Sequence, residues 1–262
     1  LVGSEMCIRD SCWKGGGAAV SNTDGTITSS VSANTEAGFS IVSYTGNETN
    51  NATVGHGLGK SPDMVIIKDR VSNSAGNNWY VFHSALASGH YVKLNQTSAT
   101  TAVSGTSNGG VGSVTSTTFN FVQGTTGNNK NVNESGDTFI AYCWTEIPGY
   151  SKFGTYTGNG LSNGSFLYLG FRPALVIIKR VDSGYSWYLI DNKRDPENQV
   201  HENLYANDGM ATYDYSVGDF LSTGIKFRNT GSDTNSSGAT MMYMAWAEQP
   251  GTTPFDTFPN GR

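Results

Sequence analysis

The stretch Pro62-Asp-Met-Val65-Ile-Ile-Lys68 decides the fold, because it returns later in the chain as Pro173-Ala-Leu-Val176-Ile-Ile-Lys179. Its apolar residues occupy both odd and even positions, which is typical of a short strand with both faces covered. Other blocks recur around it in the same order. They are Tyr44-Thr-Gly-Asn47 and Tyr156-Thr-Gly-Asn159, Asn78-Trp79-Tyr80 and Ser186-Trp187-Tyr188, and the segments 138–144 and 240–246. An ordered series of this kind indicates a tandem repeat of one domain.

Each copy contains six or seven short segments with strand character, separated by Gly, Ser, Thr and Asn. The segments 138–144 and 240–246 alternate with a period of two, which places Trp144 and Trp246 on equivalent faces. Seven short strands in about 105 residues, with turn signals every 8–12, favour a sandwich. No segment sustains a 3.6-residue period. The sequence therefore predicts an all-β fold, with two tandem antiparallel β-sandwich (jelly-roll-like) domains and little or no helix.

The repeat also sets the predicted domain boundaries. Cys12-Trp13 matches Cys143-Trp144, which closes the first copy, and Asp24-Gly25 is typical of a hairpin turn. The beginning of the chain differs in character from the rest and resembles translated sequencing-adapter read-through; an ordinary flexible terminus is the alternative. The predicted parts are an artefact at 1–11, the end of a preceding repeat with a linker at 12–38, sandwich repeats at 39–149 and 150–250, and a C-terminal tail at 251–262.

Composition excludes several classes of function. The chain has 262 residues, 16 Lys and Arg, 21 Asp and Glu, and a formal net charge of −5. A net acidic chain with scattered cations is a poor sequence-independent binder of nucleic acid. No apolar run approaches the ~20 residues of a membrane helix. We therefore expect no nucleic-acid partner and no membrane insertion, and no signal peptide is evident.

The motifs that could form a catalytic or metal site are better explained by structural roles. None of the four histidines has a metal-ligand spacing, and there is no Gly-x-Ser-x-Gly elbow. Gly55-His-Gly-Leu-Gly59 has no strand–loop–helix frame and is read as a tight turn. Cys12 and Cys143 hold the same repeat position, so we expect them not to pair with each other. The prediction is a protein that is not an enzyme and needs no cofactor and no metal.

Candidate contact residues lie in the second copy, in two polar stretches without counterparts in the first. Lys193, Arg194 and Asp195 belong to the densest charged cluster, which we expect to be an exposed loop. Tyr213 and Tyr215 lie in the loop-like stretch 212–218. Exposed loops carry binding more often than cores do. The tryptophans at repeat-equivalent positions are instead expected to pack in the cores, since both copies keep them.

Several strings together resemble a known group of proteins. They are Ala18-Ala-Val-Ser-Asn-Thr-Asp-Gly-Thr-Ile-Thr-Ser-Ser30, Phe39-Ser-Ile-Val-Ser-Tyr-Thr-Gly46, Gly55-His-Gly-Leu-Gly-Lys-Ser-Pro-Asp63, Ile140-Ala-Tyr-Cys-Trp-Thr-Glu-Ile-Pro-Gly-Tyr-Ser-Lys-Phe153 and Tyr156-Thr-Gly-Asn-Gly160. The combination is similar to tandem repeat domains of large tail-associated, tail fibre-like proteins of marine bacteriophages such as cyanophages. The resemblance covers residues 12–262, and it carries no catalytic residue that can be transferred.

The resemblance implies a virion component in a tail fibre or another host-contacting appendage. The expected partners are other virion tail proteins and a host surface glycan or protein, and a homotrimer is one candidate assembly. A bacterial secreted or surface carbohydrate-binding module is the alternative. A polysaccharide-cleaving tail enzyme is a third class, which would require a cleft with paired carboxylates.

Overall fold

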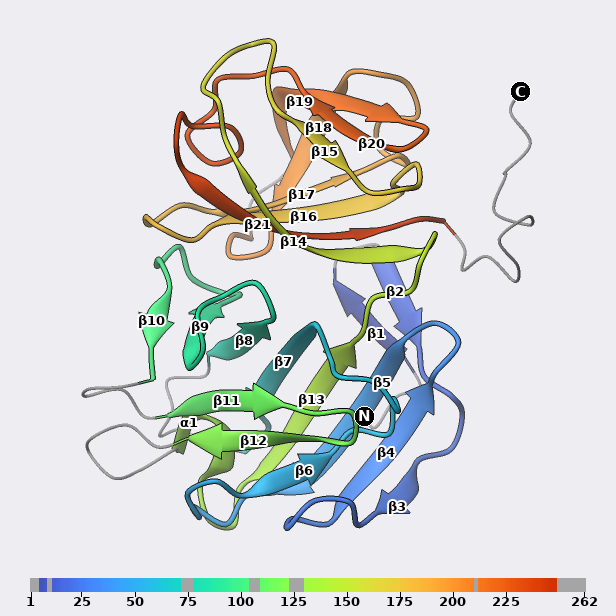
Figure 1. The fold of residues 1–262 in the computed structure, drawn as a ribbon, viewed down its shortest axis with the longest axis vertical. Helices are drawn as coiled ribbons and strands as arrows, with labels where there is room; N and C mark the ends of the chain where they lie inside the picture. The colour runs from blue at the N-terminus through green and yellow to red at the C-terminus, as the bar shows by residue number, and fades with distance from the viewer. Residues whose placement is uncertain are drawn as a thin grey trace. The chain divides into compact units, whose positions relative to one another are not determined.

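A computed structural model describes residues 5–8, 11–71, 78–103, 109–122, 130–209 and 212–248 (Figure 1). The chain divides into two compact units, Leu1–Thr145 and Glu146–Arg262. Antiparallel strands dominate both units, and the one helix of the described residues is the four-residue α1 (Lys130–Asn133). The predicted all-β fold of two sandwich-like domains is therefore confirmed.

The first unit contains an eight-stranded sheet, a three-stranded sheet and a terminal hairpin. The eight strands, in spatial order, are β10 (Thr101–Ala102), β9 (His90–Lys93), β8 (Trp79–His83), β7 (Met64–Asp69), β13 (Thr138–Trp144), β5 (Phe39–Thr45), β4 (Ser29–Asn34) and β3 (Val20–Asn22). The smaller sheet is β11 (Gly110–Val114), β12 (Thr118–Val122) and β6 (Thr53–Gly55), and the hairpin is β1 (Glu5–Ile8) with β2 (Ser11–Lys14).

The core of the first unit lies between its two sheets. Figure 1 shows β11, β12 and β6 crossing in front of the larger sheet. Phe119 and Phe121 of β12 are fully buried and pack in one cluster with Val42 of β5 and Ile67 of β7. Because side chains alternate along each strand, one face of β12 supplies these aromatic rings and the other turns outward. The unit is held together by apolar burial between two layers, as in other β-sandwiches.

The second unit is built on one eight-stranded sheet. Its strands, in spatial order, are β14 (Ser151–Thr157), β21 (Thr240–Trp246), β16 (Leu175–Arg180), β17 (Trp187–Asp191), β18 (Val200–Tyr205), β19 (Tyr213–Leu221), β20 (Gly224–Phe227) and β15 (Phe166–Tyr168). The core gathers Val176 and Ile178 of β16 with Phe220 and Phe227 from the far strands. Strands distant in this order therefore share one core, so the sheet folds back over itself into two layers.

The register of the sheets shows which strands correspond. Trp144 lies opposite Phe39 and Met64, and Trp246 lies opposite Ser151 and Leu175. The strands β5, β13, β7 and β8 thus match β14, β21, β16 and β17, and β6 and β12 match β15 and β20. Trp144 is 1% exposed and Trp246 is 3% exposed. The prediction that both are buried at equivalent positions is confirmed.

The stretch 12–38 contributes strands to the first unit. Asp24-Gly25 lies in the connection between β3 and β4, which pair antiparallel, so the predicted hairpin is confirmed. All six residues of β4 then pair with β5. Within the described residues, the second unit has no equivalent of these two strands, and only six residues separate the end of β13 from the start of β14.

Candidate functional site

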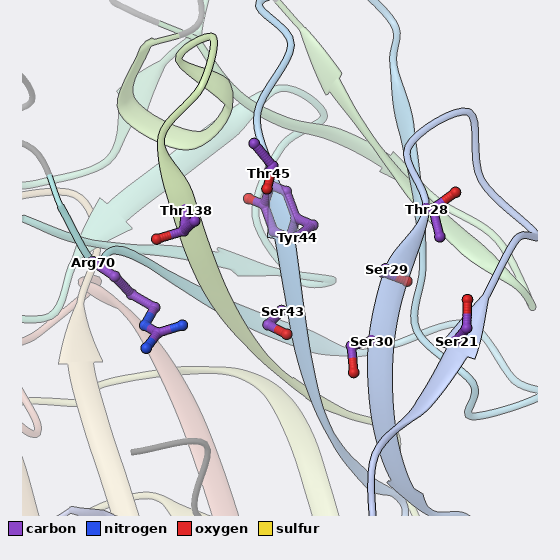
Figure 2. A pocket seen from close by; sticks show the side chains of 9 residues that line it. All are labelled: Ser21, Thr28, Ser29, Ser30, Ser43, Tyr44, Thr45, Arg70 and Thr138. Carbon is purple, nitrogen blue, oxygen red and sulfur yellow. The ribbon is translucent and has the colours of Figure 1, made fainter.

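A groove lined by hydroxyl groups crosses the first unit (Figure 2). It encloses a volume of about 350 Å³. Figure 2 shows Arg70 at one end of a row of side chains and Ser21 at the other, with Ser43 and Ser30 between them. The remaining lining residues are Thr28 and Ser29 at the start of β4, Tyr44 and Thr45 at the end of β5, and Thr138 at the start of β13.

Strand pairing produces the row. Ser21 of β3 lies opposite Ser30 of β4, and Ser30 lies opposite Ser43 of β5. Neighbouring strands are about 4.8 Å apart, so the hydroxyl groups recur at that spacing. The alternation places Val31 in the core beside them and leaves the serines outside. Arg70 is fixed at its backbone by an N–H bond of 2.9 Å to the carbonyl of Thr138.

The groove can recognise a polyhydroxylated, acidic ligand. Serine and threonine hydroxyls both donate and accept hydrogen bonds. The guanidinium of the exposed Arg70 presents a planar fork that matches a carboxylate or a phosphate. Tyr44 offers no stacking surface, since it is 4% exposed and its hydroxyl donates to the carbonyl of Val132 at 2.6 Å. Recognition here would rest on hydrogen bonds and one charge.

The predicted charged cluster of the second unit is held by internal bonds. Arg194 forms an ion pair of 3.0 Å with Asp191, whose other oxygen accepts the backbone N–H groups of Lys193 and Arg194 at 2.9 Å. Asp195 accepts the N–H groups of His201 and Glu202 at 2.8 and 2.5 Å. Lys193 is 76% exposed and pairs with Glu248. Of these three, Lys193 is the most exposed.

The two predicted tyrosines lie on a strand, so the expected loop at 212–218 is wrong. The stretch extends β18 by antiparallel pairing, with Asn203 opposite Tyr213. The ring of Tyr213 stacks on Tyr205 at 4.4 Å between centroids and its hydroxyl bonds Asp208 at 3.3 Å, whereas Tyr215 is 42% exposed. Sequence reasoning missed this pairing because the polar residues between the tyrosines have low strand propensity, whereas pairing with β18 decides the structure.

An asparagine clasp ties the Tyr-Thr-Gly-Asn motif to a distant segment in each unit, α1 in the first and the turn before β21 in the second. In the first, the backbone N–H of Asn47 donates to the side chain of Asn133 at 3.0 Å, and the amide of Asn133 returns a bond of 3.1 Å. Asn159 and Asn235 repeat both bonds at 3.1 and 3.0 Å. A side chain at the motif glycine, Gly46, would meet the backbone oxygen of Glu134 at 2.1 Å. The clasp therefore explains why the motif recurs.

The comparisons with known proteins yield a family but no function. A family model described as a domain of unknown function, DUF7483, matches residues 4–250. The chain belongs to the DUF7483 family. Comparison with curated proteins and with solved structures finds no match. The side chains of this DUF7483 chain are therefore the basis for assigning its function.

Two histidines of the DUF7483 chain are buried for structural reasons. His83 accepts the N–H of Ala85 at 3.1 Å, and His56 accepts that of Leu58 at 3.2 Å. Desolvation lowers the pKa of His56. In the described part of the chain, no group of three His, Cys, Asp or Glu side chains is placed to hold a metal ion. Neither histidine belongs to the groove.

The cysteines and the helices add two findings about this DUF7483 chain. Cys12 is disulfide-bonded, whereas Cys143 is a free, buried cysteine whose pKa burial raises to about 12. The two therefore do not pair with each other, as predicted. No helix among the described residues has the length and hydropathy to cross a membrane.

A buried lysine of the second unit was not found from the sequence. Lys179 has no exposed surface, and its ammonium donates to the carbonyls of Arg180 and Tyr185 at 2.9 and 2.7 Å. Desolvation lowers its pKa to about 8, while the charge of Asp233 opposes the shift. Its repeat counterpart Lys68 is only partly buried. The shared Ile-Ile-Lys block gave no signal of this difference, because burial at that position depends on neighbouring loops.

Proposed function

We propose that this chain is a structural and adhesive module of a bacteriophage tail fibre or related tail appendage, which contacts the host surface without chemical turnover. One observation carries the contact role: the hydroxyl row of Ser21, Ser30 and Ser43 ends at the exposed Arg70 on a paired sheet. The resemblance of the repeat blocks to tail-associated proteins of marine bacteriophages supplies the setting. Localisation in the virion and contacts with other tail proteins follow from that setting and are part of the proposal.

The mechanism is rigid presentation of a polar groove. Three neighbouring strands hold the hydroxyl groups, so little conformational entropy is lost when a ligand binds. Arg70 supplies the one charge-assisted contact, and the serines complete hydrogen bonds to a polyhydroxylated ligand. The fitting class is an acidic surface glycan. Affinity per chain is weak, and several copies in one appendage, such as a trimer, raise it through avidity.

The same groove supports a second candidate, a bacterial secreted or surface carbohydrate-binding module. Both candidates use the same contacts, so the groove alone favours neither. The assembled genomic neighbourhood separates them, since capsid and tail genes support the first and polysaccharide enzymes the second. Blocking of phage attachment by the purified protein supports only the first.

The experiment presents the chain as a multimer to a panel of host cells and to immobilised acidic and neutral glycans. We expect adsorption and preference for acidic glycans. Arg70→Ala lowers affinity by about 10- to 100-fold, because a hydrogen bond to a charged group contributes about 1.5–3 kcal/mol. Arg172→Ala, an exposed arginine of the second unit, is the charge-matched control and binds like the wild type. Absence of adsorption to every host and every glycan contradicts the contact role.

A further inference from the structure

The first unit holds a strand segment in the seam between β5 and β6. Val31 and Ser30 of this segment lie opposite Val42 and Ser43 of β5. On the other side, the N–H of Ile27 donates to the carbonyl of Thr53 at 3.0 Å, and Ile27 forms a parallel bridge with Val54 of β6. Residues 26–31 therefore pair with both edges and close the seam.

One hydrogen bond marks the difference between the units. The hydroxyl of Ser29 donates to the carbonyl of Gly55 at 2.9 Å. At the equivalent position of the second unit, the carbonyl of Tyr168 accepts the ammonium of Lys152 at 3.3 Å. A side chain of β14 thus occupies the place that the inserted segment takes in the first unit. The strands β14 and β15 are the two terminal strands of their sheet.

The surface at the seam of the second unit is apolar and exposed. Phe166 and Tyr168 are 47% and 59% exposed, and they stand where the first unit has Thr53 and Gly55. Thr155 and Thr157 of β14 are exposed as well. Beneath them the core is already closed, because the ring of Tyr243 fills the space beside Gly154. Such an edge is a template for another strand and does not require one for folding.

We propose that the second unit binds an extended strand of another polypeptide at this seam, antiparallel to residues 154–157 of β14 and beside β15. The partner strand has the chemistry of residues 26–31, with Ile, Ser and Val at the inward positions, Thr and Ser at the outward ones, and no proline. This mode of recognition is β-augmentation, in which main-chain bonds supply affinity and alternate side chains supply specificity. The inference does not depend on the proposed host contact.

The composition of the chain argues for an occupant from another polypeptide. Residues 249–262 follow β21 and contain Pro250, Pro254 and Pro259. Proline cannot donate to a strand ladder, so a strand that pairs through all its N–H groups contains none. The segment 26–31 has no proline and already pairs with the equivalent edges of the first unit. A donor strand of that kind, supplied in trans, fits the seam.

The first test titrates the full chain into a fluorescent peptide of residues 24–34 and follows anisotropy. We expect saturable binding, because the seam of the first unit already holds its own copy of this segment, whereas the seam of the second is bridged by the side chains of Lys152 and Ser165, which a strand can displace. The double variant Phe166→Thr/Tyr168→Gly, which installs the residues of the first unit, weakens binding by about tenfold, or roughly 1.4 kcal/mol. Val71→Thr, at an exposed apolar residue of the first unit, is the control and binds like the wild type.

The second test fixes the register by cross-linking. Ser30 lies opposite Ser43, whose counterpart is Thr155. A peptide with Ser30→Cys should form a disulfide with the Thr155→Cys protein, since opposed residues on antiparallel strands lie within disulfide reach. A peptide with Ser32→Cys, shifted by two residues on the same face, should react at least several-fold less. Mass spectrometry separates this product from adducts at Cys143.

Three outcomes overturn the proposal. The first is an absence of saturable binding up to about 1 mM peptide, which leaves less than roughly 4 kcal/mol of binding free energy. The second is equal cross-linking of the two peptides, which would indicate contact without a register. The third is binding that appears only after truncation at Glu248, because the chain's own C-terminal stretch would then be the occupant.

Discussion

Tyr44 in the first unit and Tyr156 in the second make the same bond, each donating its hydroxyl to a backbone carbonyl, of Val132 at 2.6 Å and of Thr234 at 2.5 Å. The strands on which they lie then differ at their outer edges. Strand β5 is covered by β4, whereas β14 is a terminal strand of its sheet. Burial follows that difference: Tyr44 is 4% exposed and Tyr156 is only partly buried.

The difference shows that the repeated strands form the scaffold of both units, whereas part of the groove is formed by a segment outside the repeat. Ser43, Thr45 and Thr138 of the groove have the hydroxylated counterparts Thr155, Thr157 and Thr240. The rest of the hydroxyl row comes from the β3–β4 segment, which precedes the repeat. The second unit therefore carries half of a groove. A strand added at its seam would supply the other half.

Truncation of Trp144 and of Trp246 tests whether equivalent core positions contribute equally to the stability of the two units. Trp144→Ala and Trp246→Ala should each lower the free energy of unfolding by about 3–5 kcal/mol, as do other large truncations in cores. Trp79→Ala should cost less, since Trp79 is only partly buried. Chemical denaturation followed by circular dichroism measures all three. Equal losses of unfolding free energy for Trp79→Ala and Trp144→Ala would show that burial does not determine the cost of truncation at these positions.

The asparagine clasp should be stronger in the second unit. Asn235 accepts the N–H of Asn159, and its two amide hydrogens are shared among the oxygens of Asn159, Leu161 and Asn229, one acceptor more than Asn133 has. Because each lost buried bond leaves a polar partner unsatisfied, Asn235→Ala should cost about 3 kcal/mol and Asn133→Ala about 2. Asn163→Ala, at an exposed asparagine, is the control in the same denaturation series. A larger loss at Asn133 would refute the ranking.

The two repeat-equivalent lysines should differ in their pH dependence. The pKa of Lys179 is lowered to about 8 by desolvation, from 10.5, so the unfolded chain holds this proton between those pH values while the folded chain releases it. Stability of the wild type relative to Lys179→Met should therefore rise from pH 8 to pH 10.5, by on the order of 2 kcal/mol. The pKa of the partly exposed Lys68 is also lowered, and Lys68→Met should show a smaller change. Identical pH profiles for the two variants would contradict the difference in burial.

The sequence supplied the scaffold more fully than the surfaces. Period-two alternation and the ordered blocks predicted strands, two domains and buried Trp144 and Trp246, because these features depend on local pattern and apolar burial. The groove was missed, since its serines come together only through the pairing of β3, β4 and β5. The clasp was missed for a related reason. Asn133 and Asn235 lie in polar Asn- and Ser-rich stretches of the sequence, whereas both are fully buried.

The smallest expected effect concerns the turn that follows β8 and β17. His83 and Asp191 hold equivalent positions, and each accepts backbone N–H groups two or three residues further on. The second unit has an ion pair there. Arg194 is 15% exposed and pairs with Asp191, so Arg194→Ala should cost about 1–2 kcal/mol by removing a charge-assisted bond.

Lys193 neighbours Arg194 in that turn, and Lys193→Ala removes the ion pair between Lys193 and Glu248. Its ammonium is largely solvated, and the loss of an exposed pair should stay below about 0.5 kcal/mol. Added salt of about 1 M should erase even that difference and reduce the effect of Arg194→Ala only in part, because screening acts chiefly on exposed charges. Thermal melts of both variants at low and high salt measure this. If Lys193→Ala costs as much as Arg194→Ala, the exposed Lys193–Glu248 pair stabilises the charged turn as much as the Arg194–Asp191 pair does. Its role would then be structural, with little charge available for contact.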